Sequence, residues 1–348
     1  PPTTPPPTNA TEAPVSRRES ASATVTQTVL NKEAAVAVAT ASSAALAVGS
    51  AVSPAAANKG ANMANILDIV SCEFDPNNDL STSTSDVWVP FSVGSGDFAP
   101  AIGGVIATLT FIALCFLLVA VVSPVMFATF PRVRTVLGAV HGIVISMLMP
   151  TACGLAMMCI SHGAEQSKAV VGAGVVGLLT ALLFYAVLAG VCATSNEIFR
   201  VGKRMRHLRG ERFFSILFLV NGTRDWAQHK YRMAFFEDLG IALGISMISG
   251  LKRPLAGSCI LPAALILLLT IGHLLYVSII RPFDLLLDTV LAIVVAALQC
   301  LLALLAGIVT VGTVKATPTA ASPGSVDGTG KGDAMKLLAY VAILQSMV

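Results

Sequence analysis

Two long apolar runs decide the fold of this sequence. Residues 256–280 read AGSCILPAALILLLTIGHLLYVSII, and residues 285–314 read LLLDTVLAIVVAALQCLLALLAGIVTVGTV. A bilayer core about 30 Å thick is crossed by roughly 20 apolar residues in an α-helix. Both runs are longer than that, and backbone groups in lipid must form their hydrogen bonds within the helix. The two runs therefore predict two transmembrane helices joined by a tight turn.

The same criterion predicts four more transmembrane helices upstream. The six predicted helices are Ile102–Phe127, Val136–Ile160, Ala169–Ala193, Phe235–Leu251, Ala256–Ile280 and Leu285–Val314. A seventh begins at Met335 and is cut off at residue 348, and the chain starts without Met, so we expect it to be a fragment or a processed product. The helix at 235–251 gives the weakest signal, because it is short and opens with two carboxylates. It can also be interpreted as an interfacial helix or one partly buried by its neighbours.

Composition favours the same fold. Hydrophobic residues make up 55% of the chain and charged residues 12%, against about 25% charged in an ordinary soluble domain. The mean hydropathy is +0.79. The excess apolar surface must face lipid. The predicted fold class is all-α, a polytopic transmembrane helix bundle with a low-complexity extracellular N-terminal region.

The region before the bundle divides by composition. Residues 1–30 are rich in Pro, Thr and Ser and predict a disordered stalk, in which Asn9 begins a glycosylation sequon. Residues 31–100 predict an Ala- and Ser-rich juxtamembrane ectodomain. Within it, 34–52 is uncharged and nearly long enough to span, but its small residues favour a helix packed outside the membrane. A polar extracellular loop is predicted at 315–334.

Positive charge fixes the predicted orientation. Lys and Arg favour the cytoplasmic side of short loops, and Arg132 and Arg134 follow the first helix, while the loop 194–233 is strongly basic. The N-terminal region is then extracellular, with the plasma membrane as the expected location. Lys252 and Arg253 fall outside, against the rule. Six residues of the basic loop are candidates for contact with anionic lipid headgroups, namely Arg200, Lys203, Arg204, Arg206, Arg209 and Arg212. Enforcement of topology explains the same charges, and the two roles are compatible.

Two of the seven cysteines, Cys72 and Cys259, would lie outside the cell, where oxidation is permitted. A disulfide between them would hold the ectodomain against the turn before the fifth helix. Two alternatives stay open: Cys72 pairs upstream of residue 1, or both thiols are free. The spacing of the cysteines includes no zinc or redox motif.

No motif of an enzyme, cofactor or metal site is recognisable, so we expect a non-enzymatic protein without cofactors. Residues 172–177 read GAGVVG, which fits a dinucleotide fingerprint in letters only, because the run lies inside an apolar helix. Small residues there let helices approach closely. The expected partners are the lipid bilayer and a second copy of the chain in a homo-oligomer, and not nucleic acid.

Three polar residues inside the spans are the candidates for a pore or for polar contacts between helices. They are His141, His273 and Gln299. Ionisable groups in the membrane are costly and therefore suggest function. The alternative is a neutral His or Gln that bonds to Ser, Thr or a carbonyl on a neighbouring helix.

Five charged residues are expected at the inner face. They are Glu237, Asp238, Arg281, Asp284 and Asp288. Arg281 can reach phosphate headgroups, and the carboxylates complement the positive ends of the helices that they open. A gate held by charge pairs is the other interpretation.

Several motifs, taken in order, resemble the membrane region of TRP-like proteins of lower eukaryotes. YR at 231–232 and FFED at 235–238 lead into a helix, a turn with Cys259, and a helix that ends SIIRPF at 278–283. The resemblance covers 231–314, and the rest of the chain is similar only in layout. The group includes large surface proteins of kinetoplastid protists and the fungal flavin-carrier-like proteins. The resemblance implies a channel-like or transport-related bundle below an extracellular region.

Two functions follow as hypotheses. The first is a multi-pass cell-surface protein with a TRP-like channel or transport bundle, which predicts a hydrated path lined by some of His141, His273 and Gln299. The second is a surface receptor or adhesin whose bundle is only an anchor and oligomerisation module. It predicts the same groups bonded between helices in a dry, small-residue core.

Overall fold

The structure, a computed structural model, describes residues 62, 63, 65, 66, 69, 92, 93, 97–126, 131–162, 167–194, 228–251, 260–283, 285–315, 337 and 341. This part of the chain is almost entirely α-helical, with no strand. The predicted stalk, the run 34–52, most of the basic loop and nearly all of the seventh helix lie outside the described residues.

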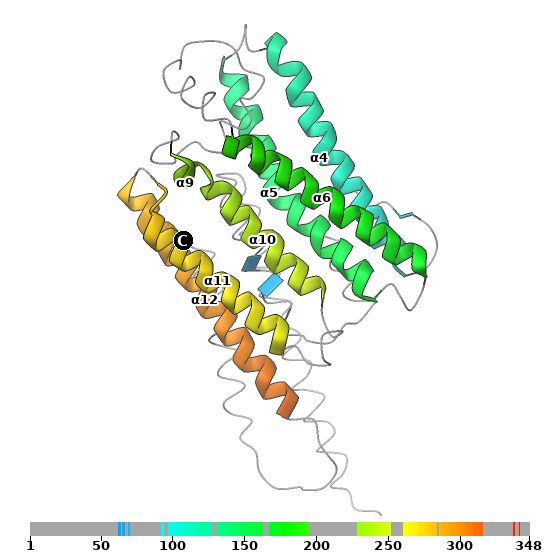
Figure 1. Cartoon of the computed structure of the whole chain (residues 1–348), viewed down its shortest axis with the longest axis vertical. Coiled ribbons are helices and arrows are strands. Elements are labelled where there is room, and N and C mark those ends of the chain that lie inside the picture. Colours follow the sequence, from blue (N-terminus) through cyan, green and yellow to red (C-terminus); the bar gives the residue numbers. More distant parts are fainter. Residues whose placement is uncertain are drawn as a thin grey trace, which may run out of the picture.

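Six long helices and one short helix make up the described bundle (Figure 1). They are α4 (Ala99–Met126), α5 (Pro131–His162), α6 (Lys168–Thr194), α9 (His229–Arg232), α10 (Ala234–Gly250), α11 (Ile260–Ile280) and α12 (Leu286–Lys315). Five of them, α4, α5, α6, α11 and α12, are long and apolar enough to cross a membrane. The prediction of an all-α membrane bundle is thereby confirmed. α5 begins at Pro131, five residues earlier than predicted, and residues 256–259, the predicted start of the fifth span, lie outside the described residues.

The fourth predicted span, 235–251, forms α10, which is shorter than the other five long helices. Its 17 residues extend about 25 Å at a rise of 1.5 Å per residue, at the lower limit for a bilayer core. Eleven of the 17 residues are buried, because α10 lies between α5 and α11. Protein therefore surrounds most of α10, which explains how a helix that opens with two carboxylates belongs to the bundle.

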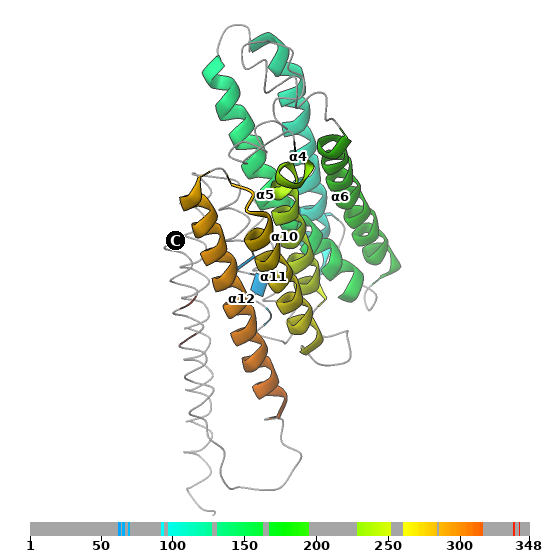
Figure 2. The same ribbon diagram turned by 60° about the vertical axis from the view of Figure 1, so that its left-hand side comes forward.

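Successive long helices run in alternate directions, as Figures 1 and 2 show. α5 packs against α4, α6 and α10, and α10 packs in turn against α11. α11 and α12 form an antiparallel hairpin whose main contact with the other helices is through α10. The fold thus consists of the group α4–α6, the hairpin α11–α12, and α10 between them.

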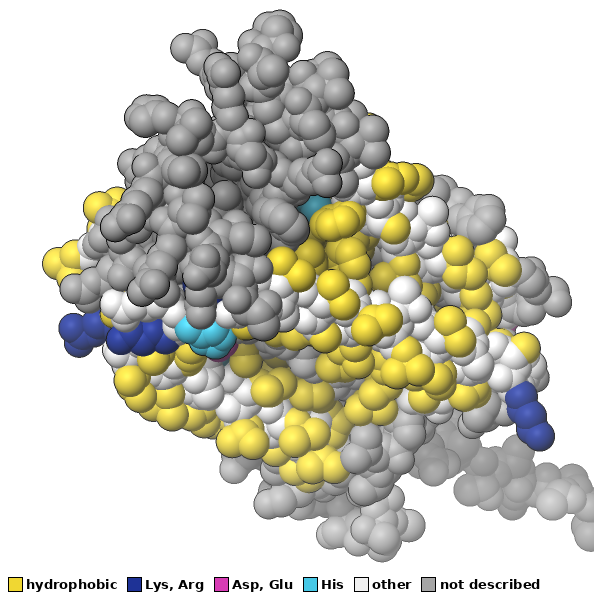
Figure 3. All heavy atoms as spheres, turned by 45° about the horizontal axis from the view of Figure 1, so that its top comes forward, with side chains coloured by type: hydrophobic (Ala, Val, Ile, Leu, Met, Phe, Trp, Pro, Cys, Tyr) yellow, Lys and Arg dark blue, Asp and Glu magenta, His cyan; other side chains and the backbone are white. Residues whose placement is uncertain are grey.

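The outer surface of the bundle is apolar. Large hydrophobic side chains project from the outer helices, among them Leu183 on α6, Leu268 and Ile279 on α11, and Leu286 on α12. On the face drawn in Figure 3, hydrophobic side chains fill the surface, and the described Lys and Arg side chains lie at its two opposite edges. An apolar belt between two polar edges is the surface that a bilayer requires.

Three hydrophobic clusters fill the interior. One joins α4, α5 and α6 to the first half of α10, around Ile145, Met149, Phe236 and Leu239. A second lies where α4 and α6 begin and α5 ends. The third joins Ile245 of α10 to α11 and α12. α10 contributes to the first and third clusters and so connects the two parts of the bundle.

α5 and α10 approach closely through small residues. A Cβ on Gly250 would lie 2.5 Å from the carbonyl oxygen of Gly154, and a Cβ on Gly154 would lie 2.6 Å from Oγ of Ser246. The Ser246 hydroxyl donates to the Pro150 carbonyl oxygen at 2.6 Å, and the Ser161 hydroxyl donates to that of Gly250 at 2.9 Å. Because glycine has no side chain, the two backbones can approach this closely, as is usual between membrane helices.

The GAGVVG run of α6 also serves packing, although not at each glycine. A Cβ on Gly174 would meet the Ala156 carbonyl oxygen at 2.7 Å, and one on Gly177 would meet Val105 at 2.5 Å. Gly172 has no atom within 4 Å of the corresponding position. Two of the three glycines are therefore required by neighbouring helices.

A short segment from the region before α4 enters the bundle. Met63, Ile66 and Ile69 are each at most 3% exposed and share the third cluster with α10, α11 and α12. The spacing of three residues places them on one face of a helix. These residues belong to the predicted juxtamembrane ectodomain 31–100, and their apolar face packs against the hairpin.

We predict that Gly250→Ala destabilises the bundle by about 1–3 kcal/mol, the usual cost of overpacking. The added methyl group would meet the Gly154 carbonyl oxygen, the Met158 amide nitrogen and Cβ of Met157 on α5. The matched control is Gly172→Ala on α6, which meets no atom within 4 Å. Thermal unfolding in detergent should show a lower transition temperature for the first variant alone. Equal temperatures for both would contradict the close contact.

We also predict that Ile66→Ala costs about 2–5 kcal/mol, the range for truncating a buried Ile. Its control is Asn65→Ala, in the same segment at a half-buried position. Protease susceptibility of the α11–α12 hairpin in detergent measures the effect. An unchanged digestion pattern for Ile66→Ala would mean that the segment does not hold the hairpin.

Candidate functional site

Three ionisable side chains meet between α10 and α11, and we call them the acid–histidine cluster: Glu237, Asp238 and His273. The Nδ1 atom of His273 lies 3.0 Å and 3.1 Å from the two carboxylate oxygens of Glu237. Its Nε2 atom lies 3.7 Å from Oδ1 of Asp238. The side chains are 5%, 20% and 12% exposed for His273, Glu237 and Asp238. The imidazole is therefore held between two carboxylates in the interior.

The local sequence explains this placement. Glu237 lies in the first turn of α10, where the positive end of the helix dipole favours a carboxylate. His273 lies in the second half of α11, and the two helices are antiparallel neighbours. The start of α10 thus faces the later turns of α11.

The geometry requires a proton at the short contact. Carboxylate oxygens only accept hydrogen bonds, and an imidazole nitrogen donates only when protonated. The 3.0 Å contact between His273 and Glu237 therefore holds a proton, either on Nδ1 or on the carboxyl group. A doubly protonated imidazole would face both carboxylates with N–H groups.

Two tyrosines lie around Glu237 from neighbouring helices. The Tyr185 hydroxyl of α6 donates to the Phe236 carbonyl oxygen at 2.8 Å, and the Tyr276 hydroxyl of α11 donates to that of Lys230 at 3.0 Å. Glu237 interacts electrostatically with both phenols. The start of α10 is thereby tied to α6 and α11.

Arg232 is the other buried charge at this end of the bundle. It is fully buried, and a guanidinium nitrogen donates to the Ala193 carbonyl oxygen at 3.0 Å. A cation suits this position, because the end of α6 carries the negative end of its dipole. Burial lowers the pKa of Arg232, whose ordinary value is so high that the guanidinium stays charged. Arg232 thus fastens α9 to α6.

The other two polar candidates have no such partners. His141 and Gln299 are buried, and no side-chain nitrogen or oxygen of either has a hydrogen-bond partner among the residues that the structure describes. His141 lies edge-on to the ring of Phe116, with ring centroids 5.7 Å apart. The structure therefore does not bring His141, Gln299 and His273 together into one site.

The predicted inner-face charges are only partly described. Arg281 is exposed, with φ of 49° and its Nε 3.4 Å from the Ser278 carbonyl oxygen, which suits a basic residue at a headgroup surface. Asp288 lies in the first turn of α12, as its capping role requires. Four single residues and one group lie outside the described residues: Asp284, Asn9, Cys72, Cys259 and the six basic-loop candidates from Arg200 to Arg212.

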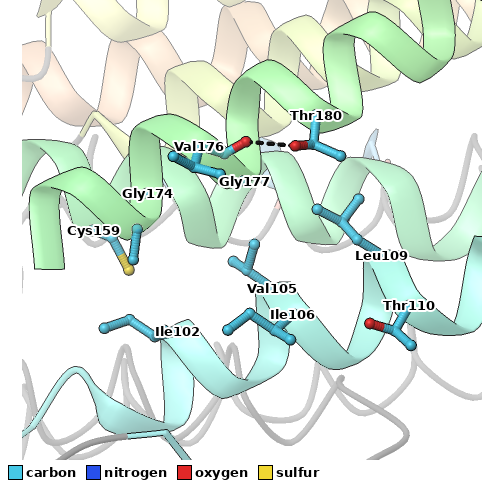
Figure 4. A pocket seen from close by; sticks show the side chains of 11 residues that line it. Ile102, Val105, Ile106, Leu109, Thr110, Cys159, Gly174, Val176, Gly177 and Thr180 are labelled. Atoms are coloured by element: carbon cyan, nitrogen blue, oxygen red, sulfur yellow. Dashed lines mark hydrogen bonds between the residues drawn. The ribbon is translucent and has the colours of Figure 1, made fainter. Parts of the chain in front are cut away.

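A cavity of about 260 Å³ opens elsewhere, between α4, α5 and α6. Its lining is apolar, with Ile102, Val105 and Val176 on its walls, apart from the hydroxyls of Thr110 and Thr180 (Figure 4). The Thr180 hydroxyl already donates to the Val176 carbonyl oxygen at 2.8 Å. This cavity includes none of the predicted polar residues.

Among the described residues, no group of three or more His, Cys, Asp and Glu side chains could hold a metal ion.

Sequence reasoning identified the members of the cluster separately and missed their contact. Glu237 and Asp238 were expected as helix caps, and His273 as a pore or inter-helix residue. Arg232, Tyr185 and Tyr276 were not selected. Arg232 belongs to a run of basic residues that resembles a solvent-exposed loop. Its position just before α10 is the one sequence feature that separates it from the other basic residues of that run.

Comparisons of the chain with family models, curated proteins and solved structures found no match.

We predict that Glu237→Gln and His273→Gln are not additive in their effects on unfolding. Residues in direct contact show interaction energies of about 0.5–3 kcal/mol. The control is Glu237→Gln combined with His141→Gln, a second buried histidine that has no hydrogen-bond partner. Denaturation of the four proteins of each cycle in detergent gives both interaction energies. Equal energies in the two cycles would show that the cluster makes no specific contribution.

Proposed function

We propose that the chain is the membrane region of a multi-pass cell-surface protein with a transport-related or channel bundle of the TRP-like type. The observation that carries this proposal is the acid–histidine cluster between α10 and α11. Ionisable groups within a membrane bundle are costly and characteristically belong to ion or proton paths. Here three of them meet where the two parts of the bundle join.

The distribution of charge supports an orientation with the N-terminal region outside the cell. In the described part, one end of the bundle carries Arg132, Arg134, Lys230, Arg232 and Arg281, and the opposite end carries Lys168 and Lys315. The basic-loop candidates 200–212 belong to the first end by their place in the chain. We propose that this end is cytoplasmic and contacts anionic lipid headgroups.

The rival function is a surface receptor or adhesin whose bundle only anchors it and forms a homo-oligomer. Two observations favour it: the glycine contacts between α5 and α10, and the burial of His141 and Gln299 away from any shared polar path. Neither explains why three ionisable groups are kept between α10 and α11. We therefore give transport precedence.

Flux through liposomes that contain the purified chain tests the proposal. Vesicles loaded with a fluorescent indicator are challenged in turn with K⁺, Na⁺, Ca²⁺, Cl⁻ and H⁺ gradients. We expect a flux above that of empty vesicles, and we expect Glu237→Gln to reduce it. Asp288→Asn, which neutralises a carboxylate at the same end but outside the cluster, should keep it.

The rival makes the opposite prediction. If the correctly folded chain carries no flux under any of these gradients, the transport proposal fails and the anchor function remains. Equal loss of flux in Glu237→Gln and Asp288→Asn would show that the cluster is not the site.

A further inference from the structure

We infer that the acid–histidine cluster is a proton-binding site that controls how the α11–α12 hairpin lies against α10. The inference rests on the proposed function in one respect, because it makes the proton the ion to which transport is coupled. The hairpin movement itself can be measured without any transport. Four observations carry the inference.

The first is the attachment of the hairpin. α11 and α12 pack mainly on each other and reach the other helices chiefly through α10. Toward the end of α10 the contact is apolar, around Ile245, Ile266 and Leu302. Near its start the contact is polar, through His273 with the two carboxylates and through the Tyr276 hydroxyl. The hairpin thus has a charged and an apolar attachment at opposite ends.

The second is the chemistry of the charged attachment. Two carboxylates and one imidazolium carry a net charge of about −1, and opposite charges in contact attract strongly where water is scarce. One further proton, taken from water, would neutralise a carboxylate and remove one of the two attractions. Release of the imidazolium proton to water would remove both ionic attractions and leave one N–H group, which can donate to only one of the two carboxylates. Each exchange therefore weakens the charged attachment of the hairpin.

The third is partial access to water. Glu237 is 20% exposed while His273 is 5% exposed. The carboxylate therefore reaches the surface of the described bundle and the imidazole lies behind it. A proton can reach His273 across the 3.0 Å contact with Glu237, which is within hydrogen-bond distance.

The fourth is the set of groups that face the cluster. α6 contributes Tyr185 and α11 contributes Tyr276, both of which interact electrostatically with Glu237. The nearby cation of α9, Arg232, donates to the end of α6, and Lys230 lies over the ring of Tyr231 at 4.7 Å.

The remaining titratable groups near α10 belong to other helices and other contacts. On α5, His141 lies against Phe116 of α4, and Cys153 and Cys159 belong to apolar clusters. On α12, Asp288 lies in the first turn. The described ionisable side chains that meet between α10 and α11 are those of the acid–histidine cluster.

The test measures the position of the hairpin as a function of pH. Spin labels are introduced as unnatural amino acids at Leu275 of α11 and Val187 of α6, both of which are exposed. Distances are recorded in lipid nanodiscs at about pH 5 and about pH 8, on either side of the ordinary titration of histidine. We expect two distance distributions in the unmodified protein. We expect one pH-independent distribution in His273→Gln and in Glu237→Gln.

Asp288→Asn is the matched control and should keep the pH-dependent shift. A distribution that does not change with pH in the unmodified protein overturns the inference. A shift that persists in both cluster variants also overturns it, because another group would then be responsible. Each variant must elute as the unmodified protein does in detergent, which separates misfolding from a lost response.

The liposome experiment keeps the two proposals apart. Flux that is independent of a pH gradient, with a hairpin that does not respond to pH, leaves the transport function standing and removes proton coupling. A pH-dependent hairpin in a chain without flux removes the transport function and keeps the proton site. Flux that increases with an inward proton gradient and loses this dependence in His273→Gln supports both.

Discussion

Lipid offers no hydrogen bonds, so the backbone groups of a membrane helix must be satisfied within the protein, and polar side chains inside the bundle are costly unless they find partners. Several of the polar contacts between helices involve α10. Its Ser246 hydroxyl bonds to α5, the Phe236 carbonyl oxygen accepts from α6, and Glu237 and Asp238 face His273 of α11. These contacts reach three different helices. The position of α10 therefore determines how α5, α6 and α11 are arranged around it.

The same constraint explains which helices the sequence alone could predict. A helix that faces lipid must be apolar along its length, and that pattern is local, so α4, α5, α6, α11 and α12 follow from hydropathy. α10 faces protein on most sides, and its carboxylates are satisfied by neighbours rather than excluded by lipid. Its weak hydropathy signal therefore reflects its central place. The position of the segment around Ile66 was harder to predict. Its three apolar residues are buried by contact with α11 and α12, which the local sequence does not reveal.

The candidate site could not be predicted as a unit. Glu237 and His273 are 36 positions apart, and whether they meet depends on the register of two antiparallel helices. That register is set by packing at the other end of the interface, around Ile245 and Ile266. The residue type alone marks His273 as a candidate, because a histidine inside a membrane span is costly. It does not predict which residue His273 contacts.

The α10–α11 interface contains apolar contacts beside the acid–histidine cluster, and the contrast between the two bears on why the cluster is there. A buried ion pair is often no more stabilising than well-packed hydrophobic residues of similar volume, because its charges lose their hydration. Toward the end of α10, Ile245 packs with Ile266 of α11 in the third cluster. Apolar contacts of this kind have no protonation state, so they hold the hairpin equally at any pH. Three ionisable groups in their place make the attachment depend on protons, and that dependence is what a structural anchor does not need.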